Sequence, residues 1–129
     1  MEVSKNEWQT PPPDSQKPVL DREQLDAATG GDIEFQGELL EAYLESCGVL
    51  RLKIDNAIDG LDLPALHALA HSLKGSSMCV GATQVAESAE VLEHAAKASN
   101  ADQCVWIMIR LRKALDAVTI EIQAMPLAA

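Results

Sequence analysis

A histidine, a lysine and a glycine lie within about one helical turn near the middle of the chain, at His71, Lys74 and Gly75. A neutral imidazole nitrogen is a competent nucleophile near neutral pH. A lysine beside it can offset the negative charge of a phosphoryl group without occupying its place. A glycine on an exposed helix face costs about 1 kcal/mol relative to alanine, so its rationale is the close approach of another molecule. Together these residues indicate phosphoryl chemistry at a surface histidine.

The expected exposure of His71 follows from its place on a helix. Apolar and small side chains recur there on one face, at about 100° per residue. They are Leu66, Leu69, Ala70, Leu73, Ser77 and Val80. His71 lies roughly 140° from the centre of this face, with Gly75 one turn further on the same side. An exposed histidine is most often only a solvated side chain, so the interpretation depends on the neighbouring Lys74 and Gly75.

Glu93 is a candidate partner of His71 because of the expected turn at Gly81. If two helices meet there as an antiparallel pair, a residue about ten positions before the turn faces one about ten to twelve positions after it. This register brings Val91, Leu92 and Glu93 level with His71, and only Glu93 is polar. Its carboxylate could hold the imidazole through Nδ1–H and leave Nε2 free. It would also repel an incoming phosphoryl group, and an ordinary solvated glutamate is the alternative.

Metal binding is a rival interpretation of the same region. His67 and His71 stand four residues apart, as two metal ligands on one helix face would. A di-metal bundle requires Glu-x-x-His on facing helices, whereas this chain offers Glu90 and His94 at a spacing of four, without a second copy. We therefore expect no metal site. A structural or adaptor bundle without phosphorylation is the other alternative.

Capping residues and helical periodicity divide the chain into one short and four long helical segments. Side chains suited to N-capping stand at Asp21, Asp32, Asp62 and Asn100. Helix stops stand at Gly30, Gly60 and Gly81. The expected helices cover Arg22 to Ala28, 33 to 59, 63 to 80, about Ala82 to Ala98, and 101 to about 125.

The predicted fold class is all-α, an antiparallel up-down four-helix bundle with a short extra N-terminal helix. Short connections between long helices make neighbours antiparallel. Residues 1–18 contain Pro11, Pro12, Pro13 and Pro18 among polar residues, and we expect a disordered tail there. The bundle is expected over residues 19–125, and residues 126–129 are expected to be disordered.

Composition supports this fold and limits the partners. The 129 residues fit one domain, with 47% hydrophobic but only 3% aromatic residues. Such a core must be aliphatic, which suits closely packed helices better than strands. The formal net charge of −10 argues against nucleic acid or an anionic membrane as the main partner and favours a basic protein surface.

Cysteine spacing and hydropathy indicate a soluble, cytoplasmic protein. The three cysteines, at Cys47, Cys79 and Cys104, share no short metal-binding spacing, and we expect reduced, semi-buried thiols. The chain does not open with a charged segment followed by an apolar one, as a secretory signal would. It also has no apolar run near the length of a membrane span.

The run from His71 to Ser77, His-Ser-Leu-Lys-Gly-Ser-Ser, followed by Gly81-Ala82, resembles the signature of histidine-containing phosphotransfer (HPt) domains. The resemblance extends to Leu25, to Gly30-Gly31-Asp32 and to Leu92-Glu93, and it covers roughly residues 20–122. It implies a four-helix bundle, in agreement with the fold predicted from periodicity.

The resemblance also implies roles for individual residues. His71 would accept a phosphoryl group from an aspartyl phosphate of a receiver domain and pass it to another receiver. Lys74 would support the phosphate charge, and Gly75 would let the receiver approach. Family members often carry a glutamine or another polar residue, hydrogen-bonded to the imidazole, where this chain has Glu93. We expect the receiver to dock on Gly75, Ser76, His67 and Met78, with Lys97 a weaker candidate near the site.

The expected function is that of a phosphorelay intermediate. The chain has no Gly-rich nucleotide loop and is too short for an ATP-binding domain beside the bundle, so we expect no kinase activity of its own. The expected partners are response-regulator receiver domains and a hybrid sensor histidine kinase, bound by a monomer. No intrinsic cofactor is expected, since the carboxylates of the receiver would supply the Mg²⁺ site.

Overall fold

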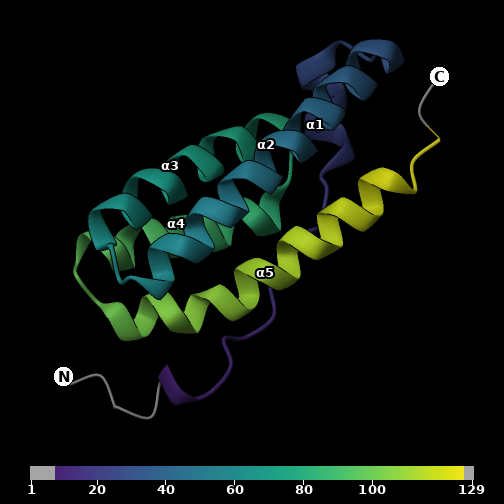
Figure 1. The fold of residues 1–129 in the computed structure, drawn as a ribbon. Helices are drawn as coiled ribbons and strands as arrows, with labels where there is room; N and C mark the ends of the chain where they lie inside the picture. Colours follow the sequence, from purple (N-terminus) through teal and green to yellow (C-terminus); the bar gives the residue numbers. More distant parts are fainter. Residues whose placement is uncertain (1–7, 127–129) are drawn as a thin grey trace.

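The computed structural model describes residues 8–126, and within them the regular secondary structure is helical, with no strand (Figure 1). The helices are α1 (Arg22–Thr29), α2 (Ile33–Asp59), α3 (Leu63–Val80), α4 (Thr83–Lys97) and α5 (Ala101–Gln123). The all-α prediction, with a short helix before four long ones, is confirmed. Residues 1–7 and 127–129, which belong to the predicted disordered ends, lie outside the described residues.

Polar caps begin four of the helices where the sequence predicts them. In each case the side-chain oxygen accepts a hydrogen bond from the backbone N–H three residues further on. The pairs are Asp21 with Gln24, Asp32 with Phe35, Asp62 with Ala65, and Asn100 with Gln103. Each such cap stabilises a helix by about 1 kcal/mol. The start of α4, at Ala82, has no side-chain cap.

The turn between α3 and α4 depends on a glycine. Gly81 has φ = 81°, in the left-handed region, and its carbonyl accepts a 2.8 Å hydrogen bond from the Asp21 backbone N–H. A Cβ at position 81 would lie 2.7 Å from the Asp21 carbonyl oxygen. The turn therefore needs glycine both for its backbone conformation and for its contact with the chain just before α1.

The core is aliphatic and lies between helices that pack on their neighbours in sequence. Helix α3 packs on α2 and α4, and α4 packs on α5 (Figure 1). The largest fully buried side chains include Leu25, Leu40, Ile54, Leu66, Leu73, Leu92, Ile107 and Leu111. Burial of each stabilises the fold by about 1.5–3 kcal/mol. None of the helices within residues 8–126 combines the length and apolar character needed to cross a bilayer.

Residues 8–18, here called the N-terminal strap, follow a defined path over α4 and α5. The Trp8 ring meets the Trp106 ring edge-on with 5.0 Å between centroids, and the Trp106 indole donates a hydrogen bond to the Thr10 carbonyl. Further along, Asp14 pairs with Lys113 at 3.1 Å. Residues 8–18 thus have partners on α4 and α5 that composition alone does not reveal, while the disordered tail predicted over 1–18 stays a prediction.

Candidate functional site

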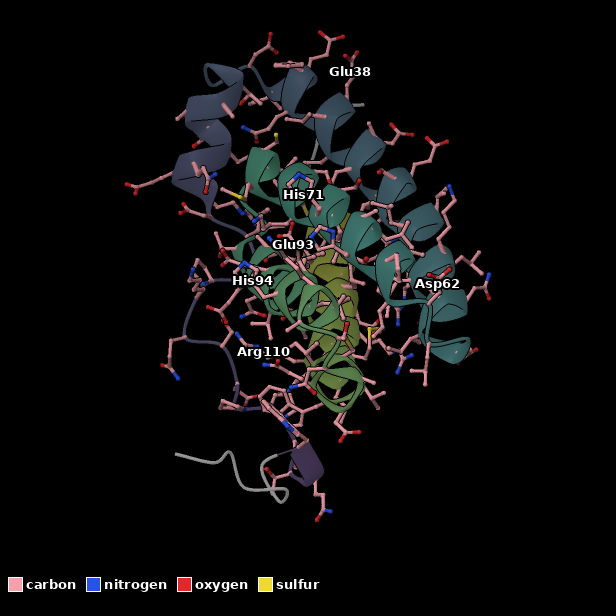
Figure 2. All side chains as sticks on the ribbon, turned by 90° about the vertical axis from the view of Figure 1, so that its left-hand side faces the viewer. Glu38, Asp62, His71, Glu93, His94 and Arg110 are labelled. Carbon is pink, nitrogen blue, oxygen red and sulfur yellow. The ribbon has the colours of Figure 1, made fainter. Side chains whose placement is uncertain are left out.

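His71 lies on the exposed face of α3, as its helical position predicts, with 69% of its side chain accessible. Figure 2 shows it near Glu93 of α4, with Glu38 of α2 above it in the view and Asp62, the N-cap of α3, further down. Nothing in the described structure covers it. An outside molecule can therefore reach the imidazole directly.

Glu93 holds the imidazole at one nitrogen. Its side chain is only 9% exposed, and Oε2 lies 2.6 Å from Nδ1 of His71. An ionised carboxylate can only accept hydrogen bonds, so Nδ1 donates its proton to Oε2. The lone pair of the neutral ring is then on Nε2. The structure therefore brings together the two residues that the predicted turn at Gly81 placed level with each other, and Glu93 is buried rather than solvated.

Lys74 contacts Glu93 from the same helix as His71. Its Nζ lies 3.0 Å from Oε1 of Glu93, and 23% of its side chain is exposed. The interaction with Lys74 holds the pKa of Glu93 below its ordinary value of 4.5, and the hydrogen bond from His71 acts in the same direction against the effect of burial. The carboxylate is therefore ionised at neutral pH, with a separate partner for each oxygen.

His67 stands one turn before His71 and faces the same carboxylate, its Nε2 being 3.9 Å from Oε2 of Glu93. This separation is too long for a hydrogen bond. Within the described part of the chain, no three His, Cys, Asp or Glu side chains are arranged to hold a metal ion. His67 and His71, the two candidate metal ligands, thus both face the Glu93 carboxylate.

The surface beside His71 is open. Gly75 is exposed, and a Cβ built on it would have no atom within 4 Å. Met78, further along α3, is 53% exposed. Ser76 donates its hydroxyl to the Leu73 carbonyl within the helix at 3.2 Å. Lys97 is exposed and makes no ion pair with Glu93 in residues 8–126. The bare and apolar part of this surface is therefore formed by Gly75 and Met78.

A hollow of about 340 Å³ continues this surface beyond Lys74 and Met78. Lys17 of the N-terminal strap and Gln24 of α1 line its other side, with Glu87 and Glu90 of α4. Gln24 also donates a 2.5 Å hydrogen bond to the Met78 carbonyl. Lys17 and Gln24 could not be predicted beside this surface, because residues so distant along the chain carry no local pattern that links them to His71.

A buried polar contact behind the site was also missed. The Tyr43 hydroxyl of α2 and the Ser77 hydroxyl of α3 are 2.7 Å apart. Burial raises the pKa of Tyr43 far above its ordinary value, so the phenol stays neutral and either group can donate. Periodicity places Ser77 on the core face, but no sequence signal pairs it with a tyrosine.

Comparisons with known proteins agree with this arrangement. Residues 38–120 match a family model described as Hpt domain. The structure is similar to the crystal structure of histidine-containing phosphotransfer protein B (HptB) from Pseudomonas aeruginosa PAO1, with a TM-score of 0.75 and 25% sequence identity. That similarity covers 82% of this chain and 92% of the other. No curated protein matches the chain. The residues matched by the family model include all of α3 and α4, and with them His71 and Glu93.

Proposed function

This chain belongs to the Hpt domain family and has a histidine phosphotransfer role in two-component signalling; on that premise, we propose that His71 is its phosphoacceptor. One observation carries this proposal: the exposed imidazole is held at Nδ1 by the buried Glu93 carboxylate, with Oε2 at 2.6 Å. The nucleophilic Nε2 is therefore available at a surface that another protein can cover. A rigid helix supports this geometry, which is what a transfer between two proteins requires.

The proposed chemistry is in-line attack by Nε2 of neutral His71 on the phosphorus of an aspartyl phosphate. A bond forms between Nε2 and phosphorus, while the bond from phosphorus to the aspartate oxygen breaks and its electron pair leaves with the carboxylate. Onward transfer is the reverse reaction at a second receiver. Mg²⁺ would be held by the carboxylates of the receiver, because the proposed site on this chain consists of a histidine and its positioning groups.

The proposed partners are receiver domains and a hybrid sensor histidine kinase, since Hpt domains act with receivers and kinases and are phosphotransfer intermediates rather than kinases. We infer that a receiver docks on Gly75 and Met78, with His67 and Ser76 at the edge of the contact. The protein would bind as a monomer. The supporting scaffold would be an antiparallel up-down bundle of α2 to α5, in keeping with the short connections between successive helices in Figure 1.

Transfer from a phosphorylated receiver tests the proposal. We expect the wild-type protein to acquire an acid-labile, base-stable phosphoryl group and His71→Gln to acquire none. His94→Gln is the matched control, because His94 is an exposed histidine on α4 without an ion pair in the described residues. Equal labelling of wild type and His71→Gln would overturn the assignment. Partner binding without any transfer would instead indicate an adaptor.

A further inference from the structure

The ammonium group of Lys74 is paired with the Glu93 carboxylate. Its Nζ is 3.0 Å from Oε1, while Oε2 of the same carboxylate accepts the hydrogen bond from Nδ1 of His71. Accessibility rises along this series, from 9% for the Glu93 side chain to 23% for Lys74 and 69% for His71. Lys74 therefore stands on the protein side of the site and the imidazole on its outer side.

The surroundings of Glu93 leave Lys74 as its permanent counter-charge. On α3 it faces His67, His71 and Lys74, and on its own helix Glu90 and Lys97 lie about one turn away. Among the described residues, no other lysine or arginine is paired with it. A buried carboxylate without a counter-charge is costly and tends to take up a proton or to turn toward water.

We propose that Lys74 is a positioning residue for the transfer: its ion pair with Oε1 keeps the Glu93 carboxylate ionised and oriented, so that Oε2 holds a proton on Nδ1 of His71 before and after phosphorylation. The inference rests on the proposed role of His71. It replaces the expected support of the phosphate charge by Lys74 with an action through Glu93.

The proton on Nδ1 matters in both directions of the reaction. In the forward step, the lone pair of Nε2 forms the bond to phosphorus, and the ring becomes cationic with its proton still on Nδ1. In the onward step, the acceptor carboxylate attacks phosphorus and the electron pair of the P–N bond returns to Nε2. The leaving group is then a neutral imidazole. Without the proton on Nδ1 it would be an imidazolate, which is a far poorer leaving group.

The electrostatics of Glu93 support this role. The contact with Lys74 lowers the pKa of Glu93 more than any other interaction, and burial raises it. Removal of the Lys74 charge would therefore let burial raise the pKa of Glu93. Oε1 would also lose the group that fixes its orientation.

A double-mutant cycle separates action through Glu93 from direct contact with phosphate. In the wild-type background, Lys74→Met should lower the rate of transfer to a receiver by about tenfold, the lower end of the loss seen when a group that orients a functional side chain is removed from a metal site. In a Glu93→Gln background, where the amide oxygen can still accept from Nδ1, the same substitution should cost less than about twofold. An equal loss in both backgrounds would overturn the inference and assign Lys74 to the phosphoryl group.

A second measurement does not depend on phosphorylation. The ¹³C shift of the Glu93 carboxyl carbon should titrate at higher pH in Lys74→Met than in wild type, and Lys74→Arg should restore the low midpoint. Lys97→Met is the matched control, since Lys97 is a nearby lysine without a contact to Glu93, and its midpoint should stay as in wild type. If the wild-type protein carries out phosphotransfer but the Glu93 titration is unchanged in Lys74→Met, only this inference is overturned. Absence of transfer from wild type would overturn the proposed function as well.

Discussion

At the scale of single residues, the buried Glu93 carboxylate makes the stability of the protein depend on acid pH. Its pKa is lowered in the folded state by Lys74 and His71. A carboxyl group whose pKa is lowered by folding stabilises the folded state at pH values above its ordinary pKa, here 4.5. This contribution is lost as the pH falls through the pKa of the folded state. The site thus contributes to folding as well as to reactivity.

Glu93→Gln should lower the free energy of unfolding by about 1–3 kcal/mol at neutral pH, because it removes the buried negative charge that pairs with Lys74 and strengthens the hydrogen bond from His71. The difference from wild type should shrink between neutral pH and an acid pH below 4.5, since the lowered pKa of the wild-type carboxylate is approached there and the group takes up a proton. Urea unfolding followed by circular dichroism at both pH values measures it. Glu90→Gln, an exposed change on the same helix, should have little effect at either pH. A difference that grew toward acid pH would contradict the assignment.

Gly75 separates the requirements of folding from those of docking. Its Cβ position is open, so Gly75→Leu should raise the stability of α3 by up to about 1 kcal/mol, while the new side chain lowers the rate of transfer from a receiver by at least about tenfold. Urea unfolding and a transfer assay on the same preparation measure the two effects.

Gly48 of α2 provides the matched control for Gly75. It is also an exposed helical glycine with no atom within 4 Å of its Cβ position. Gly48→Leu should show a similar gain in stability with the rate of transfer unchanged. If both variants transferred normally, the docking surface would not include Gly75.

At the scale of helices, α2 is joined to α3 by the buried hydroxyl pair of Tyr43 and Ser77. Tyr43→Phe should lower the free energy of unfolding by about 1–2 kcal/mol, since it leaves the Ser77 hydroxyl buried without that partner. Ser77→Ala and the double variant complete a cycle measured by urea unfolding. The two single effects should not add, because each substitution removes the same hydrogen bond. Additive losses would show that the two hydroxyls do not act as a pair.

The helices themselves could be predicted from the sequence because their signals are local. Caps at Asp21, Asp32, Asp62 and Asn100, and the glycine after α3, act within one or two turns. The contact between His71 and Glu93 could also be predicted, since the single turn at Gly81 sets the register between α3 and α4. The direction of the Lys74 side chain could not be predicted, because the partner of a long side chain depends on which charged and buried groups surround it in the folded protein.

At the scale of the whole molecule, the path of the N-terminal strap could not be read from the sequence. Its contacts join Trp8 to Trp106 and Asp14 to Lys113, and the two residues of the second pair are 99 positions apart in the sequence. The prolines correctly exclude a helix there. They do not reveal that α5 offers a tryptophan and a lysine to an extended segment.

The charge of the molecule is also unevenly placed. No lysine or arginine lies between Glu23 and Glu45, where the acidic residues are Glu23, Asp26, Asp32, Glu34, Glu38, Glu41 and Glu45. Figure 2 shows Glu38 at the upper end of the view, with His71 below it and Asp62 further away. This end of the molecule should therefore attract a basic surface on a docking receiver.

Glu38→Lys should slow phosphotransfer from a receiver with a basic docking face by about two- to fivefold at low ionic strength, and added salt should reduce the difference. Stopped-flow mixing at several salt concentrations measures it. Asp59→Lys is the matched control, with the same change of charge at the other end of α2. Equal slowing by both variants would indicate an effect of net charge alone.

The contact between Trp8 and Trp106 also determines which structural change the tryptophan fluorescence of this protein can detect. The chain has two tryptophans, and both rings lie in this one contact between the N-terminal strap and α5. On heating, tryptophan fluorescence should change when the strap detaches, before circular dichroism records the loss of the helices. Coincident transitions would show that strap and helices melt as one unit. If fluorescence changes before circular dichroism, it reports selectively on attachment of the strap and is a misleading measure of global stability.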